Sequence, residues 1–347
     1  MGTLLLMMGC THQPNAKVAD AMSEQDKKKL AFDCVHEQAL ELSAETQELY
    51  KYAYYHDLHN MWMPKQEIWQ AVAVYYRIAA ANGDYKANVR LQYLLSTGRL
   101  KHDKAVREAV ALNNVLKEQL PGTADYNSYK YIQKGVLKSD EELGQFAYLR
   151  KAADLGSPQA QYVMYDRLTD MHDTPDRKFL FDLGMKFLKC SAEQGYGEAN
   201  QDVGIYLRKD NKYKEALDTF YAGAKQGDTQ SALKLSNAFE LDVKVTPPSS
   251  TRYKISYLAV EQDLERARRY KIIRRYLSNN DHLNPKVPDL DQIVPLPPAK
   301  LPEWDGKIAF QRWFEGESPN QPSDDLVKKL AEAKGLDPKT GLVLNKK

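Results

Sequence analysis

The chain has 347 residues, of which 43% are hydrophobic and 28% are charged, so it can bury a large core and has the composition of a folded protein. Its 49 Lys and Arg residues nearly balance 47 Asp and Glu residues, which leaves a formal net charge of +2. This balance gives no general electrostatic reason to expect nucleic acid as a partner. No apolar run approaches the roughly 20 residues that a membrane-spanning helix needs.

The chain begins with an apolar run that ends in Met7-Met8-Gly9-Cys10. This ending resembles a bacterial lipoprotein signal, in which the cysteine is lipidated and becomes the first residue of the mature protein. We therefore expect residues 1–19 to be a signal remnant and tether, with Cys10 as the lipidation site and membrane anchor. Because Thr11 rather than Asp follows the cysteine, the resemblance implies a periplasmic lipoprotein of the outer membrane. A terminus that is apolar by chance is the alternative.

Residues 20–68 are predicted to form one or two N-terminal capping helices, because apolar residues recur through them at helical spacing. The positions concerned are Leu30, Cys34, Leu40, Leu49 and Tyr52. Cys34 and Cys190 could form a disulfide in an oxidising compartment, but the sequence cannot place such distant residues together. We prefer the interpretation that both cysteines are small buried residues on helices.

An aromatic and histidine-rich stretch in this region is a candidate partner-binding surface, because aromatic residues dominate binding hot spots. Its members are Tyr54, Tyr55, His56, His59 and Trp62. His56 and His59 lie one helical turn apart, but a metal site needs further ligands that the sequence does not identify. We therefore predict no metal site, and the alternative is an ordinary helix face or loop.

Four segments between residues 69 and 242 share one pattern, which ends on Gly83, Gly156, Gly195 and Gly227. In each, an aromatic residue precedes the glycine by about two helical turns, and small residues fill the interval. A small residue follows about four positions after the glycine, and an apolar residue comes after that. Gly122 lies near the middle of the longest interval and is interpreted as a degenerate copy.

The pattern has a physical interpretation as a helix pair. Each glycine is predicted to end a helix in the left-handed conformation, which only glycine adopts cheaply. The small residues let the next helix approach closely, and each pair presents an apolar face that needs a neighbour. The sequence therefore predicts an all-α fold, a helical-repeat solenoid of stacked antiparallel helix pairs.

One copy of the pattern is especially specific. Residues 150–162, which read Arg-Lys-Ala-Ala-Asp-Leu-Gly-Ser-Pro-Gln-Ala-Gln-Tyr, resemble the Sel-one-like repeat, a relative of the tetratricopeptide repeat. The copies at 187–206 and 75–91 match well, whereas Ser231 replaces an alanine in the last copy. The resemblance implies a scaffold that binds a protein partner and has no catalytic machinery of its own.

Residues 243–347 are predicted to be a C-terminal capping domain that contains one helix over 251–279. Prolines are dense between 287 and 306, which forbids a long helix and holds the chain extended. The apolar residues between them favour a strap over the end of the solenoid, and a proline-rich ligand for a recognition module is the alternative. The predicted anchors are Leu290, Ile293, Val294, Leu296, Leu301 and Trp304.

The C-terminal part has two other features, a short helix and a basic run. Ser323 is expected to cap a short helix over 326–334, which Gly335 ends. A basic run over 266–275 includes Arg268 and Arg269, which are candidate contacts for an acidic partner or for anionic headgroups. The alternative is the solvated face of a helix.

The sequence contains no nucleophile elbow, phosphate-binding glycine loop, zincin helix or paired-cysteine metal motif. We therefore expect neither an enzyme nor a cofactor. The proline-rich segment, with Pro-Asp-Leu-Asp at 288–291 and Leu-Pro-Glu-Trp-Asp-Gly at 301–306, resembles a bacterial domain of unknown function that follows Sel-one-like repeats.

Proteins of this combined type, often lipoproteins, occur as immunity partners of type VI secretion phospholipase effectors. The resemblance implies a periplasmic immunity protein that binds a lipase or phospholipase toxin and inhibits it sterically. The alternative function is a general envelope scaffold or signalling adaptor built on the same repeats.

Overall fold

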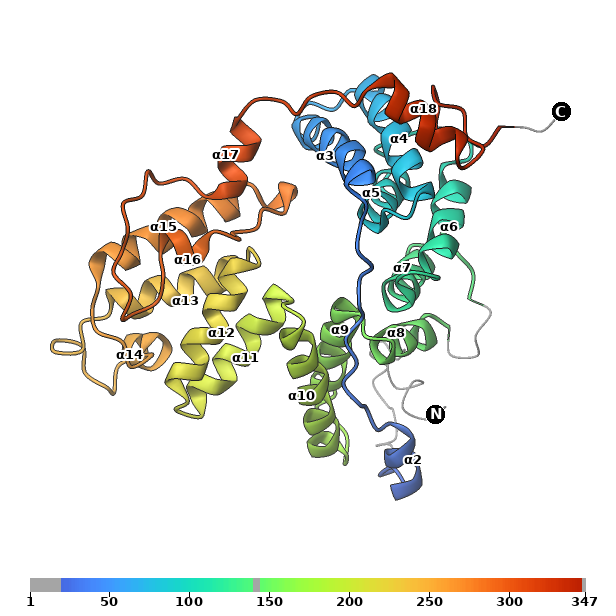
Figure 1. The fold of residues 1–347 in the computed structure, drawn as a ribbon. Coiled ribbons are helices and arrows are strands. Elements are labelled where there is room, and N and C mark those ends of the chain that lie inside the picture. The colour runs from blue at the N-terminus through green and yellow to red at the C-terminus, as the bar shows by residue number, and fades with distance from the viewer. Residues whose placement is uncertain (1–19, 140–143, 345–347) are drawn as a thin grey trace. The chain divides into compact units, whose positions relative to one another are not determined.

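The computed structural model describes residues 20–139 and 144–344, and in these ranges every regular element is a helix (Figure 1). The only pairing of extended backbone among them is an isolated bridge between Leu336 and Val343. The predicted all-α class is therefore confirmed. None of the described helices is long and apolar enough to cross a bilayer. Cys10 and the predicted tether lie outside the described residues.

The chain divides into two compact units, each made of two separate stretches of sequence. Unit 1 combines Met1–His36 with Ser157–Gly316, and unit 2 combines Glu37–Gly156 with Glu317–Lys347. The change between them falls at the turn after Gly156, within the repeats.

Unit 2 is a series of helices in which each packs against the next along the chain. Hydrogen bonds between alternate helices, such as those from Arg90 on α5 to Asp57 on α3, place them in one layer. An ion pair between Arg77 and Glu108 joins α4 to α6 in the other layer. The helices are α3 (Ala44–His59), α4 (Gln66–Ala81), α5 (Tyr85–Ser96), α6 (Ala105–Leu116), α7 (Pro121–Gln133), α8 (Gln145–Asp154) and α18 (Asp324–Glu332).

Unit 1 continues the same scheme with five consecutive packed helices, and α15 packs against the last of them. A hydrogen bond between the hydroxyls of Tyr165 and Tyr206 joins α9 to α11 in one layer. The elements are α2 (Glu24–Lys29), α9 (Pro158–Thr169), α10 (Arg177–Glu193), α11 (Gly197–Lys209), α12 (Tyr213–Lys225), α13 (Thr229–Glu240), α14 (Thr251–Ser256), α15 (Leu264–Asn279), the 3₁₀ turn η1 (Asp281–Leu283), α16 (Leu290–Ile293) and α17 (Ala309–Glu315).

The predicted helix-ending glycines all have the left-handed backbone. Their φ angles are +95° at Gly83, +97° at Gly156, +79° at Gly195 and +83° at Gly227. The small residues that follow them, Ala87, Ala160, Ala199 and Ala232, are fully buried. The helix-pair interpretation of these four segments is therefore confirmed, since the turn glycine and the small contact residue occupy the predicted places.

The interval around Gly122 holds a helix pair, α6 and α7, as the interpretation of a degenerate copy predicted. Gly122 is not a helix terminator, because it lies buried in the first turn of α7 just after Pro121. The carboxylate of Glu37 accepts hydrogen bonds from the backbone N–H groups of Gly122 and Thr123, at 2.6 Å and 3.1 Å. A side chain from outside the repeat thus satisfies amides that the helix itself leaves unpaired.

The predicted single helix over 251–279 is wrong, because α14 and α15 are separate helices. Between them Leu258 turns into the core of unit 1 and Ala259 adopts a positive φ of 52°. The N–H of Asp263 donates to the carbonyl of Phe239 on α13, and the Asp263 carboxylate accepts from the N–H of Arg266 to cap α15. Burial of Leu258 and this new cap outweigh helix continuity.

The predicted strap is present in unit 1. Val287, Leu290, Ile293 and Val294 are buried against the core formed by α12, α13 and α15, with Leu296, Leu301 and Trp304 partly buried beside them. The N–H of Val287 donates to the carbonyl of Lys225 at 2.9 Å. The prolines do not exclude helix altogether, because the single turn α16 fits between Pro288 and Pro295.

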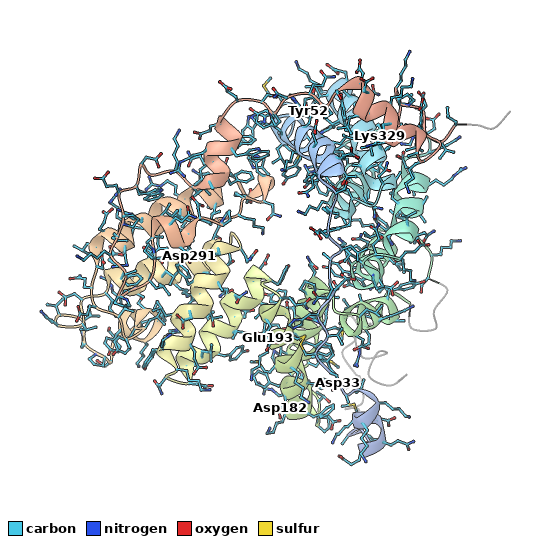
Figure 2. The ribbon with its side chains drawn as sticks, viewed as in Figure 1. Asp33, Tyr52, Asp182, Glu193, Asp291 and Lys329 are labelled. Carbon is cyan, nitrogen blue, oxygen red and sulfur yellow. A yellow bond between two sulfur atoms is a disulfide. The ribbon has the colours of Figure 1, made fainter. Side chains whose placement is uncertain are left out.

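The N-terminal part, predicted to form one or two helices over residues 20–68, contains α2 and α3. Between α2 and α3 the chain has no helix over residues 31–43, and Leu40 is 59% exposed. Within unit 1, Phe32 stacks on Phe187 of α10 with ring centroids 3.8 Å apart. Figure 2 shows Asp33 and Glu193 near this part of unit 1.

Cys34 and Cys190 form a disulfide, which corrects the interpretation of two buried helix residues. Cys190 is buried on α10, but Cys34 is exposed on the extended segment. The bond holds residues 30–36 along α10, where the carbonyl of Val35 also accepts a hydrogen bond from Gln161 Nε2 at 3.0 Å. The sequence could not show this pairing because 156 positions separate the two residues.

We expect reduction of this disulfide to lower the free energy of unfolding by about 2–4 kcal/mol, because the closed loop restricts the unfolded chain. The measurement is thermal melting with and without a dithiol reductant. The Cys34→Ser variant is the control and should melt at the reduced temperature in both conditions. Identical melting of the oxidised and reduced protein would contradict a stabilising role.

Candidate protein-binding surface

The predicted aromatic and histidine stretch is divided between the interior and the surface of unit 2. Tyr55 is buried, and His59 Nδ1 lies 2.8 Å from its carbonyl oxygen. His56 is half-buried, and its ring lies 4.5 Å from the ring of Tyr52, which Figure 2 labels on α3. Burial, followed by the nearby charge of His59, lowers the pKa of His56. These residues therefore do not share one exposed face.

The other two members of the stretch lie toward solvent in different places. Trp62 is 81% exposed in the turn that joins α3 to α4. Tyr54 is half-buried, and its ring lies 5.5 Å from the guanidinium carbon of Arg90 on α5. The side chain of Trp62 is therefore largely accessible at the surface, whereas that of Tyr54 is only partly accessible.

The two candidate arginines of α15 have different roles. Arg268 is exposed and pairs with Glu265, at 2.7 Å. Arg269 is buried and donates hydrogen bonds to the strap carbonyls of Ile293 and Pro302, at 2.6 Å and 2.7 Å. The candidate binding role of Arg269 is therefore corrected, because its guanidinium holds the strap. Hydrogen bonds from Arg268 and Arg269 lower the pKa of Glu265 to about 2.

One group of potential metal ligands occurs among the described residues. Suitable atoms of Cys34, His36 and Cys190 lie within 4.8 Å of one another. Both sulfur atoms belong to the disulfide, so neither is a thiolate that can bind a cation. This cluster therefore serves to staple the N-terminal segment.

Sequence analysis missed a second surface, on the α3, α5 and α7 layer of unit 2. The guanidinium of Arg90 lies between Tyr54 and Tyr93, 4.7 Å from the Tyr93 ring centroid. Arg99 also lies over Tyr93, at 4.9 Å. On α7, the ammonium of Lys130 lies 4.8 Å from the ring centroid of Tyr126. We call these six residues the cation–aromatic surface: Tyr54, Arg90, Tyr93, Arg99, Tyr126 and Lys130.

A buried ion pair fixes the first part of this surface. Arg90 donates from Nε and Nη2 to the two carboxylate oxygens of Asp57, at 2.6 Å and 3.0 Å. The hydroxyl of Tyr76 donates to the same carboxylate at 2.9 Å. Burial alone would lower the pKa of Arg90, but hydrogen bonding to Asp57 raises it. A bidentate pair of this kind holds a guanidinium in one orientation.

A ladder of buried polar side chains fixes the second part. Gln92 of α5 accepts hydrogen bonds from Tyr131 at 2.8 Å and from Asn127 at 3.3 Å, both on α7. Asn127 also donates to Asn113 of α6 at 3.2 Å. Because buried polar groups are costly without partners, these bonds specify how α5 and α7 lie beside each other.

Unit 1 has a small group of carboxylates on α9 and α11. Tyr162 donates to Asp202 at 3.1 Å, and the exposed carboxylates of Asp166 and Glu198 lie on the same two helices. Burial, together with the charges of Asp228, Asp166 and Glu198, raises the pKa of Asp202 even though Tyr162 lowers it. These carboxylates lie close enough to affect one another, although Arg167, Arg208 and Lys209 balance their charge on the same two helices.

The sequence did contain a signal for the cation–aromatic surface. Arg90 and Tyr93 are three positions apart, and Tyr126 and Lys130 are four positions apart, so each pair shares a helix face. These spacings are common on helices, which is why they do not reveal a surface unless the helix neighbours are known.

Comparison with known proteins adds a family match in the C-terminal part. The model of a domain of unknown function, DUF6396, matches residues 231–344. This stretch begins on α13 and includes the strap and α18. The predicted resemblance of the C-terminal segment to a domain of unknown function is thereby confirmed. No match was found among the curated proteins. The Sel-one-like identity of the repeats stays a prediction.

Solved structures share the fold over 77% of this chain. Immunity protein PA5088 from Pseudomonas aeruginosa is 24% identical, with a TM-score of 0.54 and 94% of its chain covered. Immunity protein Pa5087 from the same organism is 23% identical, with a TM-score of 0.50 and 95% covered. A third Pseudomonas aeruginosa protein, PA5086, is 24% identical, with a TM-score of 0.51 and 95% covered. These likenesses establish a shared fold.

Neighbouring arginines on α15 offer a direct test of the strap's attachment. Arg269→Ala removes the donors to two strap carbonyls, of which that of Ile293 is buried, and should lower the free energy of unfolding by about 2–4 kcal/mol. Arg268→Ala is the matched control and should leave the melting temperature unchanged, because its ion pair is exposed. Equal melting of the two variants, measured by circular dichroism, would argue against the assignment.

Proposed function

We propose that this chain is an immunity protein that binds a protein toxin and blocks its activity. The observation that carries the proposal is the fold shared with immunity proteins PA5088 and Pa5087 over nearly the whole of those chains. The sequence resemblance of the proline-rich segment to a domain that occurs in immunity lipoproteins also supports it. The family match over residues 231–344 includes that segment.

The architecture suits inhibition by binding. Tandem helix pairs give an extended rigid layer in each unit, and such layers typically bind proteins along one face. Inhibition would be steric, since a toxin held against this layer cannot admit its substrate or open a lid. No residue of the chain needs to take part in a chemical step.

The finer parts of the proposal come from the sequence resemblance. The toxin would be a type VI secretion effector with lipase or phospholipase activity, acting in the periplasm. Lipidation of Cys10 would anchor the chain to the outer membrane.

We expect the full-length protein to fractionate with membranes and Cys10→Ala to release it, and equal partitioning of the two forms would contradict the anchor.

Inhibition is tested with the purified chain and the phospholipase effector encoded beside its gene. We expect lipid hydrolysis to stop near a one-to-one ratio, with a dissociation constant on the order of nanomolar, because protection requires that almost no free toxin remain. An unrelated phospholipase is the control and should stay active.

Two results would contradict the proposal in different ways. Absence of binding to the effector would favour a general envelope scaffold. Hydrolysis by the purified chain itself would identify an enzyme. The membrane fractionation of the Cys10 variant is independent of both results, because a lipid anchor localises the protein without altering its binding surface.

A further inference from the structure

We propose that the cation–aromatic surface of unit 2 binds an acidic surface patch of the partner protein. This inference rests on the proposed function, because it names the surface by which the chain would hold its toxin. It also names the chemistry of that toxin surface, namely carboxylates that face Arg99 and Lys130.

The first step of the argument is the distribution of charge on α5 and α7. These two helices carry a single acidic residue between them, Asp125. Its side chain is buried and pairs with Lys117 and Lys151, so it does not offset the charge of the exposed face. Basic residues therefore dominate the exposed faces of α5 and α7.

The second step is the state of the cations themselves. Among the described residues, no carboxylate lies within ion-pair distance of Arg99 or Lys130, which contact the rings of Tyr93 and Tyr126 instead. Burial, and then the like charge of Lys134, lowers the pKa of Lys130 to about 8. A partner carboxylate would supply the missing counter-charge. The unpaired charge is unfavourable in the free chain, and the ion pair formed in the complex would favour binding.

The third step is rigidity. Asp57 fixes the Arg90 guanidinium, and the ladder from Gln92 to Asn127 fixes α5 beside α7. Tyrosine and arginine that are already ordered lose little conformational entropy on binding, which is why they are common in hot spots. The surface is thus preorganised for a specific partner.

A protein partner fits this arrangement better than a membrane does. Binding to anionic lipid typically uses clusters of basic side chains that reach the headgroups, together with apolar residues that insert. Here Arg90 and Arg99 lie against aromatic rings, and Lys130 is half-buried. These cations can meet a complementary protein surface at close range but do not project toward a bilayer.

The basic run on α15 is not an equivalent surface. Arg266 and Arg269 are buried, and both donate to carbonyls of the strap. Arg268 and Lys271 each pair with a glutamate. Arg274 and Arg275 also have no carboxylate partner among the described residues. Arg99 and Lys130 differ from them because each lies against a tyrosine ring that belongs to the surface.

The test reverses the two charges that lack an ion pair, with a matched control. In the full-length chain, Arg99→Glu and Lys130→Glu are combined in one variant. The control combines Lys104→Glu and Arg107→Glu, which make the same charge change at exposed positions, the N-cap and the first turn of α6 in the other layer. Binding to the purified phospholipase effector is measured by association and dissociation rates at low and high salt.

We expect the surface variant to bind at least about tenfold more weakly, largely through a slower association rate, and the control within about twofold of the wild type. The wild-type association rate should fall with added salt, and that of the surface variant should fall less. Equal binding by both variants would overturn the inference. Absence of binding by the wild type would instead contradict the proposed function.

Two additional measurements separate folding and membrane effects from recognition. If the surface variant melts early, Arg99→Gln with Lys130→Gln removes the charges more gently and should still weaken binding, while Arg99→Lys with Lys130→Arg should restore it. Equal binding by these two double variants would overturn the inference. Vesicles of anionic phospholipid are the second probe. Loss of vesicle binding with unchanged effector binding would identify a membrane surface instead.

Discussion

Each helix pair of this chain has an apolar face that only another packed element can cover, and this constraint governs the structure. Within the repeats the next pair supplies the cover, because a left-handed glycine ends one helix and a buried alanine admits the next. Where a series of pairs stops, other elements must take over. In unit 1 the strap lies over α12, α13 and α15, and in unit 2 α18 lies against α4.

The covering elements are held by a few polar contacts at defined places. Arg269 reaches from α15 to two strap carbonyls, and Asn82 donates from the end of α4 to the carbonyl of Leu330 on α18. Lys329, which Figure 2 labels, pairs with Glu45 of α3. Apolar burial supplies most of the driving force for docking the strap and α18. Because apolar contacts are not directional, the polar contacts select one position for each element.

Local physics decides which features the sequence could reveal. The four turn glycines were predictable because the left-handed backbone depends on the residue itself, and the strap was predictable because proline forbids a long helix. The disulfide was not, since pairing Cys34 with Cys190 depends on how residues 30–36 lie along α10. The break before α15 was hidden because Leu258 fits both a helical stripe and the core.

The roles of Arg268 and Arg269 show the same limit at the scale of one position. Successive helix residues point about 100° apart, so one guanidinium faces solvent while the next enters the core. A basic run in the sequence therefore does not define a basic surface until the packing of the helix is known. The opposite is true of the candidate surface on α5 and α7. Its cations are far apart in the sequence, and only the packing of the helices brings them together.

The near balance of charge over the whole chain has a consequence for recognition. The net charge of +2 is too small to steer a partner from a distance, and screening at physiological salt limits each exposed charge to about 8 Å. Recognition must then depend on local surfaces, where Arg99 and Lys130 lie without carboxylate partners among the described residues. Cations without ion-pair partners lower the free energy of unfolding of the free chain. The buried ladder of Gln92, Asn113 and Asn127 holds the surface in place, because moving α5 away from α7 would leave these amides unpaired.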